Sequence, residues 1–588
     1  MNRRKLSFHA LAVLFLLLVF WYVNRASELL RGAFEDGTSM ALALQNTGIE
    51  MLRNPFYLSI NSIDLAVAGA SVLVLLITAL QRRKVFRPGE EYGSARFGTM
   101  RDIQPFIDPD PDKNIILTGT ERLSMSLHMK RTKTEDYNRN KNVLVIGGSG
   151  SGKTRYFVKP NILQMYGSYV VTDPKGTVMR EVGHALEING YDIKMLNVTD
   201  AAGMRQSLHY NPLAYAKDEA GILKLVDVLM SNTNGEGLKP SGDPFWQSSE
   251  KLLYCALISY ILSCGEPEDK NLGTLVDMIS AFEVHEEDAD FKCAVDLLFD
   301  QLESECPEHF AVKQYKKFKL AAGKTAKSIL ISCGARLAPF DIKEVRDLMA
   351  YDELDLDKLG DKKTALFVIT SDTDKTFNFI AALMYSQMFN LLCDKALYDY
   401  GGVLPVHVRC ILDEFYNIGR IPNFDQIIAV IRSRNMSACP ILQSKAQGEG
   451  IYDKKADIIV DNCDTLLFLG GKGKILEEVV KLLGRQTIDQ FNTSKSRGNQ
   501  KSDSTNYQKL GRELMTIDEL ASMSRSECIC HIGGIRPFKS KKYDLTQHPR
   551  YHLTSDADRS NAYTPLWLRP HVTISAEERF EVLHISNH

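Results

Sequence analysis

A glycine-rich loop at residues 147–154 carries the clearest chemical signal in the chain. It reads "GGSGSGKT", follows the apolar run "NVLVI" and precedes a segment with helix-like spacing. Glycines let the backbone N–H groups of such a loop point inward around phosphates. We expect Lys153 to reach the β- and γ-phosphates and the Thr154 hydroxyl to bind Mg²⁺. The predicted nucleotide-contacting residues are Gly147, Gly148, Ser149, Gly150, Ser151, Gly152, Lys153, Thr154 and Arg155.

Two acidic residues end a later strand-like run. The stretch "VHVRCILDEF" at 406–415 places Asp413 and Glu414 directly after apolar residues. Phosphoryl transfer to water needs a carboxylate near the metal and a group that activates the water. We assign the metal role to Asp413 and the activation of water to Glu414. The alternative for this pair taken alone is a solvated strand end.

A glutamine and two arginines follow the acid pair. Gln443 ends the strand-like run "ACPILQ", and in RecA-like ATPases a glutamine at this place senses the γ-phosphate. Arg432 and Arg434 precede the same run, where an arginine commonly reaches the neighbouring subunit's nucleotide. Such a finger is worth about 10³–10⁵ in rate in other phosphoryl-transfer enzymes. We prefer Arg432 as the finger; the alternative is a basic helix end that complements the helix dipole.

A further polar pair lies in "TDPKG", directly after the run "SYVV". Ligands of open α/β sheets bind at the carboxyl ends of the strands. We therefore expect Asp173 and Lys175 to lie near the nucleotide. The alternative is a tight Pro-Gly turn without contact to a ligand.

The elements that must position these residues alternate between strand-like and helical patterns, which indicates an α/β fold around a central sheet. The strand-like runs are nearly all apolar, as buried strands of a parallel sheet are. Pro440 is unusual within such a strand because proline cannot donate a ladder hydrogen bond. The predicted strands are 142–147, 168–173, 193–198, 364–370, 408–413, 438–443, 464–470 and 527–533.

The chain has 588 residues, so two or three domains are expected. The alternation stops over 201–360, which reads as an all-helical domain inserted into a RecA-like P-loop ATPase core. The core is then formed by 91–200 and 361–588. Residues 491–510 are polar without an apolar pattern, and we predict a flexible loop there.

Two apolar runs at the start predict a transmembrane hairpin over residues 1–90, with spans of about 6–23 and 62–80. Each is long enough to cross a hydrocarbon core of roughly 30 Å as a helix. The alternative for the first run is a cleaved signal peptide, but no clear A-x-A site follows it. Basic residues flank the hairpin at both ends and place both in the cytoplasm: Arg3, Arg4, Lys5, Arg82, Arg83 and Lys84.

Composition constrains the function only loosely. The net charge is −2, so the whole chain shows no basic signal for nucleic acid, although a local patch can still bind it. The eleven cysteines are scattered and suit a reducing compartment. The stretch "ECICHIGG", with Cys528, Cys530 and His531, favours a buried strand over a metal site.

The order of these motifs resembles that of the coupling proteins of type IV secretion and conjugation systems, the TraG-like family of RecA-type motors. Segments along nearly the whole chain carry the resemblance: "EYGSARFGTMRDI", "GGSGSGKT", "TDPKG", "NPLAYA", "DPFWQSSE", "LDEFYNIGRIP", "LQSKAQ" and "GRELMTIDEL". The resemblance implies an ATP- and Mg²⁺-dependent homo-hexamer anchored in the bacterial plasma (inner) membrane, with its N-terminus and ATPase domain in the cytoplasm. It implies relaxase-bound single-stranded DNA, secreted proteins and secretion-channel subunits as partners, and substrate recognition by the helical insert.

Three other functions share some of these features. A coupling ATPase that exports only proteins shares every motif. An FtsK-like DNA translocase is expected to have more spans and a C-terminal DNA-reading domain. A membrane-anchored AAA protease needs H-E-x-x-H, whereas "VHEEDA" at 284–289 lacks the second histidine.

Overall fold

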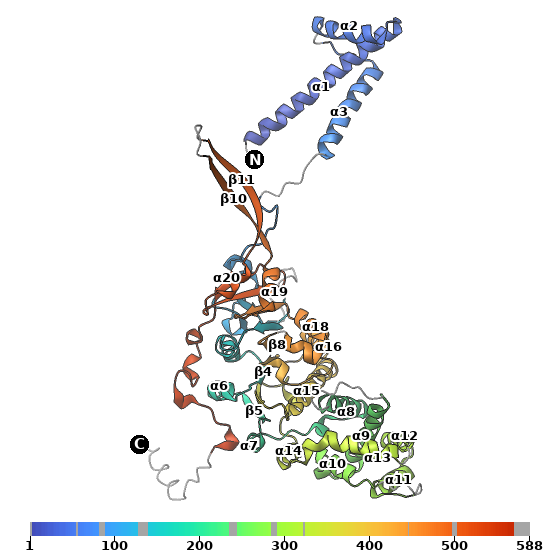
Figure 1. Cartoon of the computed structure of the whole chain (residues 1–588), viewed down its shortest axis with the longest axis vertical. Coiled ribbons are helices and arrows are strands. Elements are labelled where there is room, and N and C mark those ends of the chain that lie inside the picture. The colour runs from blue at the N-terminus through green and yellow to red at the C-terminus, as the bar shows by residue number, and fades with distance from the viewer. Residues whose placement is uncertain are drawn as a thin grey trace. The chain divides into compact units, whose positions relative to one another are not determined.

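The computed structural model describes residues 3–54, 57–81, 89–126, 139–233, 244–283, 291–321, 324–444, 446–496 and 502–569. The chain forms two compact units, Met1–Glu91 and Tyr92–His588 (Figure 1). Each unit is described by itself.

The first unit consists of three helices, α1 (Arg3–Glu35), α2 (Met40–Arg53) and α3 (Ser62–Gln81). α1 and α3 lie side by side, and α2 packs against α1 (Figure 1). Within the described residues, Ala12–Glu35 of α1 is long and apolar enough to cross a membrane, and Ser62–Thr78 of α3 is apolar but shorter. The expected basic cluster after the second span lies outside the described residues.

A polar network joins the two long helices. Asp64 of α3 is fully buried and accepts hydrogen bonds from Ser27 Oγ (2.8 Å), Ser59 Oγ (2.8 Å) and Arg31 Nη2 (3.0 Å). These donors compensate the cost of burying the carboxylate. The network therefore fixes the register of α1 against α3.

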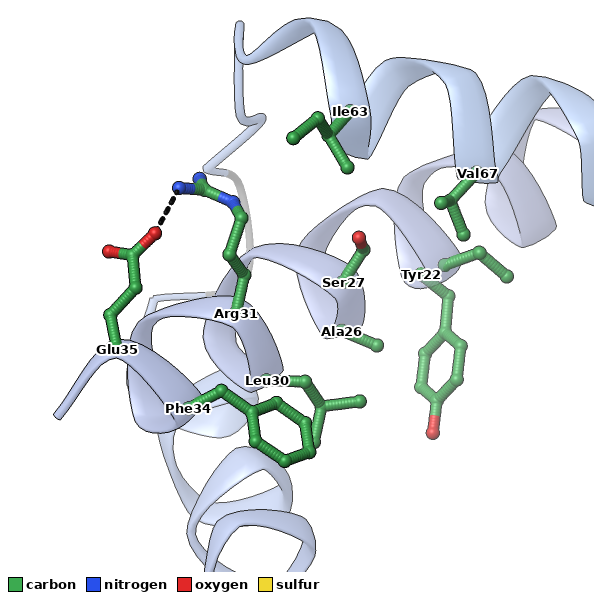
Figure 2. Close-up of a pocket in the computed structure, with 10 residues that line it drawn as sticks. Tyr22, Ala26, Ser27, Leu30, Arg31, Phe34, Glu35, Ile63 and Val67 are labelled. Atoms are coloured by element: carbon green, nitrogen blue, oxygen red, sulfur yellow. Dashed lines mark hydrogen bonds and ion pairs between the residues drawn. The ribbon is translucent and has the colours of Figure 1, made fainter. Parts of the chain in front are cut away.

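A groove of about 620 Å³ lies beside this network, between α1 and α3. Figure 2 shows Arg31 at one end of it, paired with Glu35 at 3.3 Å. The other lining side chains are mostly apolar and come from both helices: Tyr22, Val23, Ala26, Ser27, Leu30, Phe34, Ile63 and Val67.

The second unit is built on a nine-stranded sheet with the strand order β13-β12-β9-β3-β8-β7-β4-β6-β5. All eight strand-like runs of the sequence form strands of this sheet, so that prediction is confirmed. The strands from β9 to β5 are parallel, whereas β12 and β13 add antiparallel at one edge. The bounds are β3 (Val143–Ile146), β4 (Ser168–Thr172), β5 (Asp192–Asn197), β6 (Thr364–Ile369), β7 (Val408–Leu412), β8 (Met436–Leu442), β9 (Thr465–Phe468), β12 (Glu527–Ile532) and β13 (Phe538–Lys541).

Alternate residues of the buried strands contribute to two separate hydrophobic cores. Leu144 and Val170 belong to one core, and Val143 and Val171 belong to the other. Side chains of a strand point alternately to the two faces of a sheet, so an all-apolar strand needs a cover on both faces. The helices α5 (Lys159–Leu163) and α6 (Thr177–Ile188) pack in the second core.

Pro440 lies inside the central strand β8, opposite Leu412 of β7. Ala438, two residues earlier, donates to the Asn142 side chain rather than to a strand backbone (2.9 Å). Pairing of β8 with β3 begins only at Ile441. Backbone groups two residues apart point to the same side of a strand, so the missing N–H of Pro440 would point toward β3, as that of Ala438 does. At this position β8 is not yet paired with β3, so no ladder hydrogen bond is lost. The central strand therefore tolerates this proline.

The described residues between β5 and β6 contain helices and no strand. Their apolar residues continue the first core of the sheet rather than forming a core of their own. The α-helices are α7 (Ala201–Met204), α8 (Glu219–Asn232), α9 (Pro244–Cys264), α10 (Leu272–Ser280), α11 (Ala294–Glu305), α12 (Phe310–Lys319), α13 (Lys324–Leu337) and α14 (Lys343–Leu348). After β6 come α15 (Asn378–Tyr398), α16 (Phe424–Val430), α17 (Ala446–Tyr452), α18 (Lys455–Asp461), α19 (Lys474–Leu483) and α20 (Ile517–Ala521).

The prediction of a flexible loop at 491–510 is wrong for the residues that the structure describes there. β10 (Arg485–Ser496) and β11 (Ser502–Glu513) pair antiparallel as a two-stranded ribbon (Figure 1). The sequence signal failed because a two-stranded ribbon need not bury a face, so polar residues show no apolar alternation. Near its base, Ala95 N donates to Arg485 O (3.0 Å) and Thr487 N to Gly93 O (3.2 Å). A short hairpin of β1 (Asn114–Ile116) and β2 (Arg122–Ser124) was also not predicted.

Candidate functional site

The glycine-rich loop begins where β3 ends, and the two strands beside β3 hold it. Gly147 N donates to Leu442 O at the end of β8 (3.0 Å). Gly148 N donates to Gly470 O, just after β9 (3.1 Å). Because β9, β3 and β8 are parallel neighbours, the loop and the residue after β8 lie together at the carboxyl ends of these strands.

Two glycines of the loop are required by close packing. A Cβ on Gly147 would collide with Ser151 Oγ. Gly152 has a φ of +82°, and a Cβ there would overlap the Tyr156 ring. A left-handed backbone with a ring at this distance admits only glycine. These constraints keep the loop backbone open toward the space in front of it.

The helix after the loop starts with a π-helical turn, η4 (Thr154–Val158), and continues as α5. Pro160 explains the wider turn, because proline cannot donate to the carbonyl of Tyr156 and its ring would clash there. Lys153 and Thr154 thus lie at the very start of a helix whose N–H groups point toward the loop.

The acid pair follows β7. Asp413 is buried, and burial raises its pKa to about 6, although the Lys153 ammonium opposes this rise. Glu414 has a φ of +49°, a left-handed conformation that costs a non-glycine residue about 1–2 kcal/mol. Its N–H donates to Asp413 Oδ1 (3.0 Å).

A chain of polar contacts links the loop, the acid pair and the glutamine. Gln443 Nε2 donates to Glu414 Oε1 at 2.7 Å, and Lys153 Nζ reaches the same oxygen at 3.4 Å. Lys153 Nζ also donates to Gly147 O (3.1 Å). The Glu414 side chain is therefore held between the Lys153 ammonium of the glycine-rich loop and the Gln443 amide that follows β8.

Lys153, Asp413, Glu414 and Gln443 line one pocket of about 580 Å³ together with the loop residues 148–155, whereas Gly147 does not line it. Asp173 and Lys175 line the pocket as well. Asp173 Oδ2 also accepts a hydrogen bond from Met179 N in the first turn of α6 (3.0 Å), and burial raises the pKa of this carboxyl. Asp173 therefore stabilises the start of α6 as well as lining the pocket.

The two candidate finger arginines lie elsewhere. Arg432 and Arg434 form part of the 3₁₀ turn η10 (Ile431–Arg434), which precedes the seven-residue strand β8, whereas Gln443 follows it. They lie where the amino ends of the parallel strands meet, whereas the pocket lies at the carboxyl ends, and neither arginine lines the pocket. Neither side chain serves the pocket of its own chain.

Several pocket residues were missed in the sequence. Asp372 follows β6 and Asn417 follows β7, so both had the signal of polar residues at strand carboxyl ends. Lys159 had no such signal. Its Nζ pairs with Glu181 Oε2 (2.7 Å) and with Asp556 Oδ2 (2.5 Å), and Asp556 lies far along the chain.

The donor set suits Mg²⁺ rather than an all-protein metal cage. Among the described residues, no group of three or more His, Cys, Asp or Glu side chains gathers around a common point. Mg²⁺ is usually held by one or two protein oxygens, water and substrate phosphates. The Thr154 hydroxyl and the Asp413 carboxylate, both lining the pocket, fit that pattern.

Similar solved structures share this fold. The bacterial conjugative coupling protein TrwBdeltaN70, in an unbound monoclinic form, is 14% identical, with a TM-score of 0.55 over 78% of this chain and 96% of that one. TrwB in complex with ADP and Mg²⁺ is also 14% identical, with a TM-score of 0.52 over 77% and 96%. TrwB in complex with the non-hydrolysable ATP analogue ADPNP gives 14%, a TM-score of 0.51, and 77% and 96%. No curated protein sequence matches the chain.

The sequence family described as "Type IV secretory system Conjugative DNA transfer" matches residues 107–560, which include the loop, the acid pair, Gln443 and Asp556. This match covers most of the chain and the whole of the pocket described above. The chain therefore belongs to the family of type IV secretory system conjugative DNA transfer proteins, the TraG-like coupling proteins.

Proposed function

We propose that this protein is a membrane-anchored ATPase that delivers relaxase-bound single-stranded DNA, protein substrates or both to a type IV secretion channel. The observation that carries the proposal is the convergence of Lys153, Asp413, Glu414 and Gln443 on one pocket at the mouth of the glycine-rich loop. Family membership supplies the conjugative DNA transfer, and the similar fold of TrwB solved with ADPNP and with ADP and Mg²⁺ supports the nucleotide.

Each residue has a role in hydrolysis. The loop from Gly147 to Arg155 binds the phosphates, with Lys153 on the β- and γ-phosphates. Thr154 and Asp413 hold Mg²⁺, which neutralises charge on the phosphates. Glu414 activates the attacking water, because Asp413 serves the metal and the Glu414 carboxylate lines the pocket beside Lys153 and Gln443. Gln443 orients Glu414 and senses the γ-phosphate, while Asp173 and Lys175 complete the wall.

The membrane anchor is a two-span hairpin formed by α1 and α3. The Asp64 network and the length of α1 support it, since a buried carboxylate with three donors joins the helices as one unit. With both ends in the cytoplasm, the ATPase part lies on the cytoplasmic side of the bacterial plasma membrane. The helices between 201 and 360 form the inserted domain that recognises the substrate, between the two parts of the nucleotide-binding domain, 91–200 and 361–588.

The subunits assemble as a homo-hexameric ring in which Arg432 or Arg434 completes the neighbour's site. Both arginines lie at the amino ends of the strands, away from the pocket of their own chain, and this placement supports action between subunits. Arg432 is the preferred finger because its side chain is exposed, whereas that of Arg434 is half-buried.

The first experiment measures ATP hydrolysis by the full-length, detergent-solubilised protein without DNA, with single-stranded DNA and with duplex DNA. Lys153→Ala is the control for contaminating ATPases. We expect DNA to raise the rate of the native protein and Lys153→Ala to abolish hydrolysis. Hydrolysis that ignores DNA favours the protein-exporting coupling ATPase, and stimulation by duplex DNA alone favours an FtsK-like translocase. A protein that does not hydrolyse ATP refutes the proposal.

The ring is tested by mixing two inactive variants, Lys153→Ala and Arg432→Ala, in detergent. If the finger acts between subunits, random mixing creates some interfaces with an intact Lys153 on one side and an intact Arg432 on the other. We expect about a quarter of the native rate to return at equal mixing. Arg434→Ala mixed in the same way is the matched comparison. No recovery from either mixture contradicts a finger supplied by the neighbour.

A further inference from the structure

The described C-terminal segment, residues 542–569, contacts the glycine-rich loop and the helix that follows it. It leaves β13 and passes through four 3₁₀ turns, Leu545–Gln547, Tyr551–Leu553, Arg559–Asn561 and Leu566–Leu568. Figure 1 shows it running past α6 toward α7. Trp567 Nε1 donates to Gln206 O, just after α7 (2.9 Å). The segment therefore packs against residues that line the pocket, although none of its own residues lines it.

Lys542 is the residue of this segment that reaches the loop. It is buried, and its Nζ donates to Ser151 O at 2.9 Å. The same Nζ lies 5.3 Å from the centre of the Tyr156 ring, which fills the space beside Gly152. Its backbone is fixed as well, because Lys542 N donates to Ser526 O (2.8 Å).

The geometry of a peptide unit gives this contact a consequence at the pocket. Ser151 C=O and Gly152 N–H belong to the same planar trans peptide and point in opposite directions. An ammonium group that holds the carbonyl from behind therefore turns the Gly152 N–H toward the phosphate side. Consecutive hydrogen bonds through one peptide unit also polarise each other, so the bond from Lys542 to Ser151 O strengthens the Gly152 N–H as a donor.

We propose that Lys542 is a positioning residue for nucleotide binding, which orients the Gly152 N–H by holding Ser151 O. The proposal rests on the proposed function, because it names a residue that acts on the same nucleotide site. The lysine reaches no phosphate itself and acts through the Ser151–Gly152 peptide.

Contacts farther along the segment keep Lys542 in place independently of the loop. Arg550 pairs with Asp112 through two bonds of 2.8 Å and 2.6 Å and donates to Leu163 O at the end of α5 (3.1 Å). Asp556 pairs with Lys159 (2.5 Å). The segment thus spans the loop helix from start to end, so Lys542 approaches the loop from a rigid support.

The test uses the full-length protein in detergent with Mg²⁺ and compares Lys542→Met, Lys542→Arg and Lys541→Met. Lys541 is the matched control because it is the preceding residue and is exposed. The measurements are the Kd for ADP and the KM and kcat for ATP. We expect Lys542→Met to raise the Kd for ADP about tenfold, the effect of losing one charge-assisted hydrogen bond. Lys542→Arg is expected to restore most of the affinity, and Lys541→Met to leave it unchanged.

The KM should rise more than kcat falls, because the Gly152 N–H binds phosphate in the bound nucleotide as well as in the transition state. A Kd for Lys542→Met equal to that of Lys541→Met overturns the proposal. If Lys542→Met does not fold, Lys542→Ala takes its place, since it removes the donor without adding bulk to the buried site. A Kd for Lys542→Ala equal to that of Lys541→Met also overturns the proposal. Failure of the proposed function itself shows differently, as a native protein that binds no ADP or is unaffected by Lys153→Ala.

Discussion

Removing the amide of Gln443 should slow hydrolysis through Glu414 rather than through the nucleotide directly. In the structure Gln443 Nε2 donates to Glu414 Oε1 at 2.7 Å, and that oxygen also faces Lys153 Nζ. Gln443→Leu deletes this donor with little change of volume. It leaves Glu414 free to turn away from the position in which it activates water.

The size of the effect follows from the type of bond. A hydrogen bond to a charged group contributes about 1.5–3 kcal/mol, and the half-buried position of Gln443 favours the lower end. Since about 1.4 kcal/mol corresponds to tenfold in rate, Gln443→Leu should lower kcat about tenfold. Glu414→Gln removes the carboxylate itself and should lower kcat by about 10²–10⁴.

A double-mutant cycle tests whether Gln443 acts through Glu414. We expect Gln443→Leu to lower the residual rate of Glu414→Gln by less than about threefold, because the charged partner is already gone. The assay is single-turnover hydrolysis of ATP by the full-length protein, with the Kd for ADP as the control that the pocket remains intact.

One result would refute this reasoning. If Gln443→Leu costs the same tenfold in the Glu414→Gln background, the two residues act independently. Gln443 would then act through the γ-phosphate alone, which is the role expected from its position after β8, and the 2.7 Å bond to Glu414 would have no part in the rate.

Two further predictions concern the C-terminal segment. Gly183→Ala in α6 places a Cβ 2.5 Å from the Tyr563 ring and should lower the thermal midpoint of the full-length protein, since overpacking costs about 1–3 kcal/mol. Gly334→Ala in α13 has open space at the Cβ and should raise the midpoint, because it stabilises the folded protein by up to about 1 kcal/mol. An equal rise of the midpoint in both variants contradicts the close packing at Gly183. Burial lowers the pKa of His548 to about 4, and its Nε2 bonds to Gln164, so stability present above pH 6.5 should be lost as the pH falls through 4, by roughly 3 kcal/mol. Denaturation midpoints from pH 7 to pH 4 should fall less in His548→Asn, and parallel curves for the two proteins contradict this.

Much of the pocket could be predicted from the sequence because its signals are local. The loop "GGSGSGKT", the acid pair at 413–414 and all eight buried strands are recognised from neighbouring residues: glycine spacing, carboxylates after an apolar run, and uniformly apolar segments. The physical cause is that a strand buried on both faces must be apolar throughout, whatever its neighbours are.

The tertiary structure decided what depends on partners far apart in the chain. Strand order places β8 between β3 and β7, and that order brings Gln443 against Glu414 and beside the glycine-rich loop. The ribbon of β10 and β11 had no sequence signal because it is polar, with no apolar alternation over residues 491–510. Lys542 also had none, since one lysine in a polar segment looks like any surface charge. Only the fold shows that it lies against Ser151, because a single polar contact over so long a sequence separation leaves no periodic pattern in either segment.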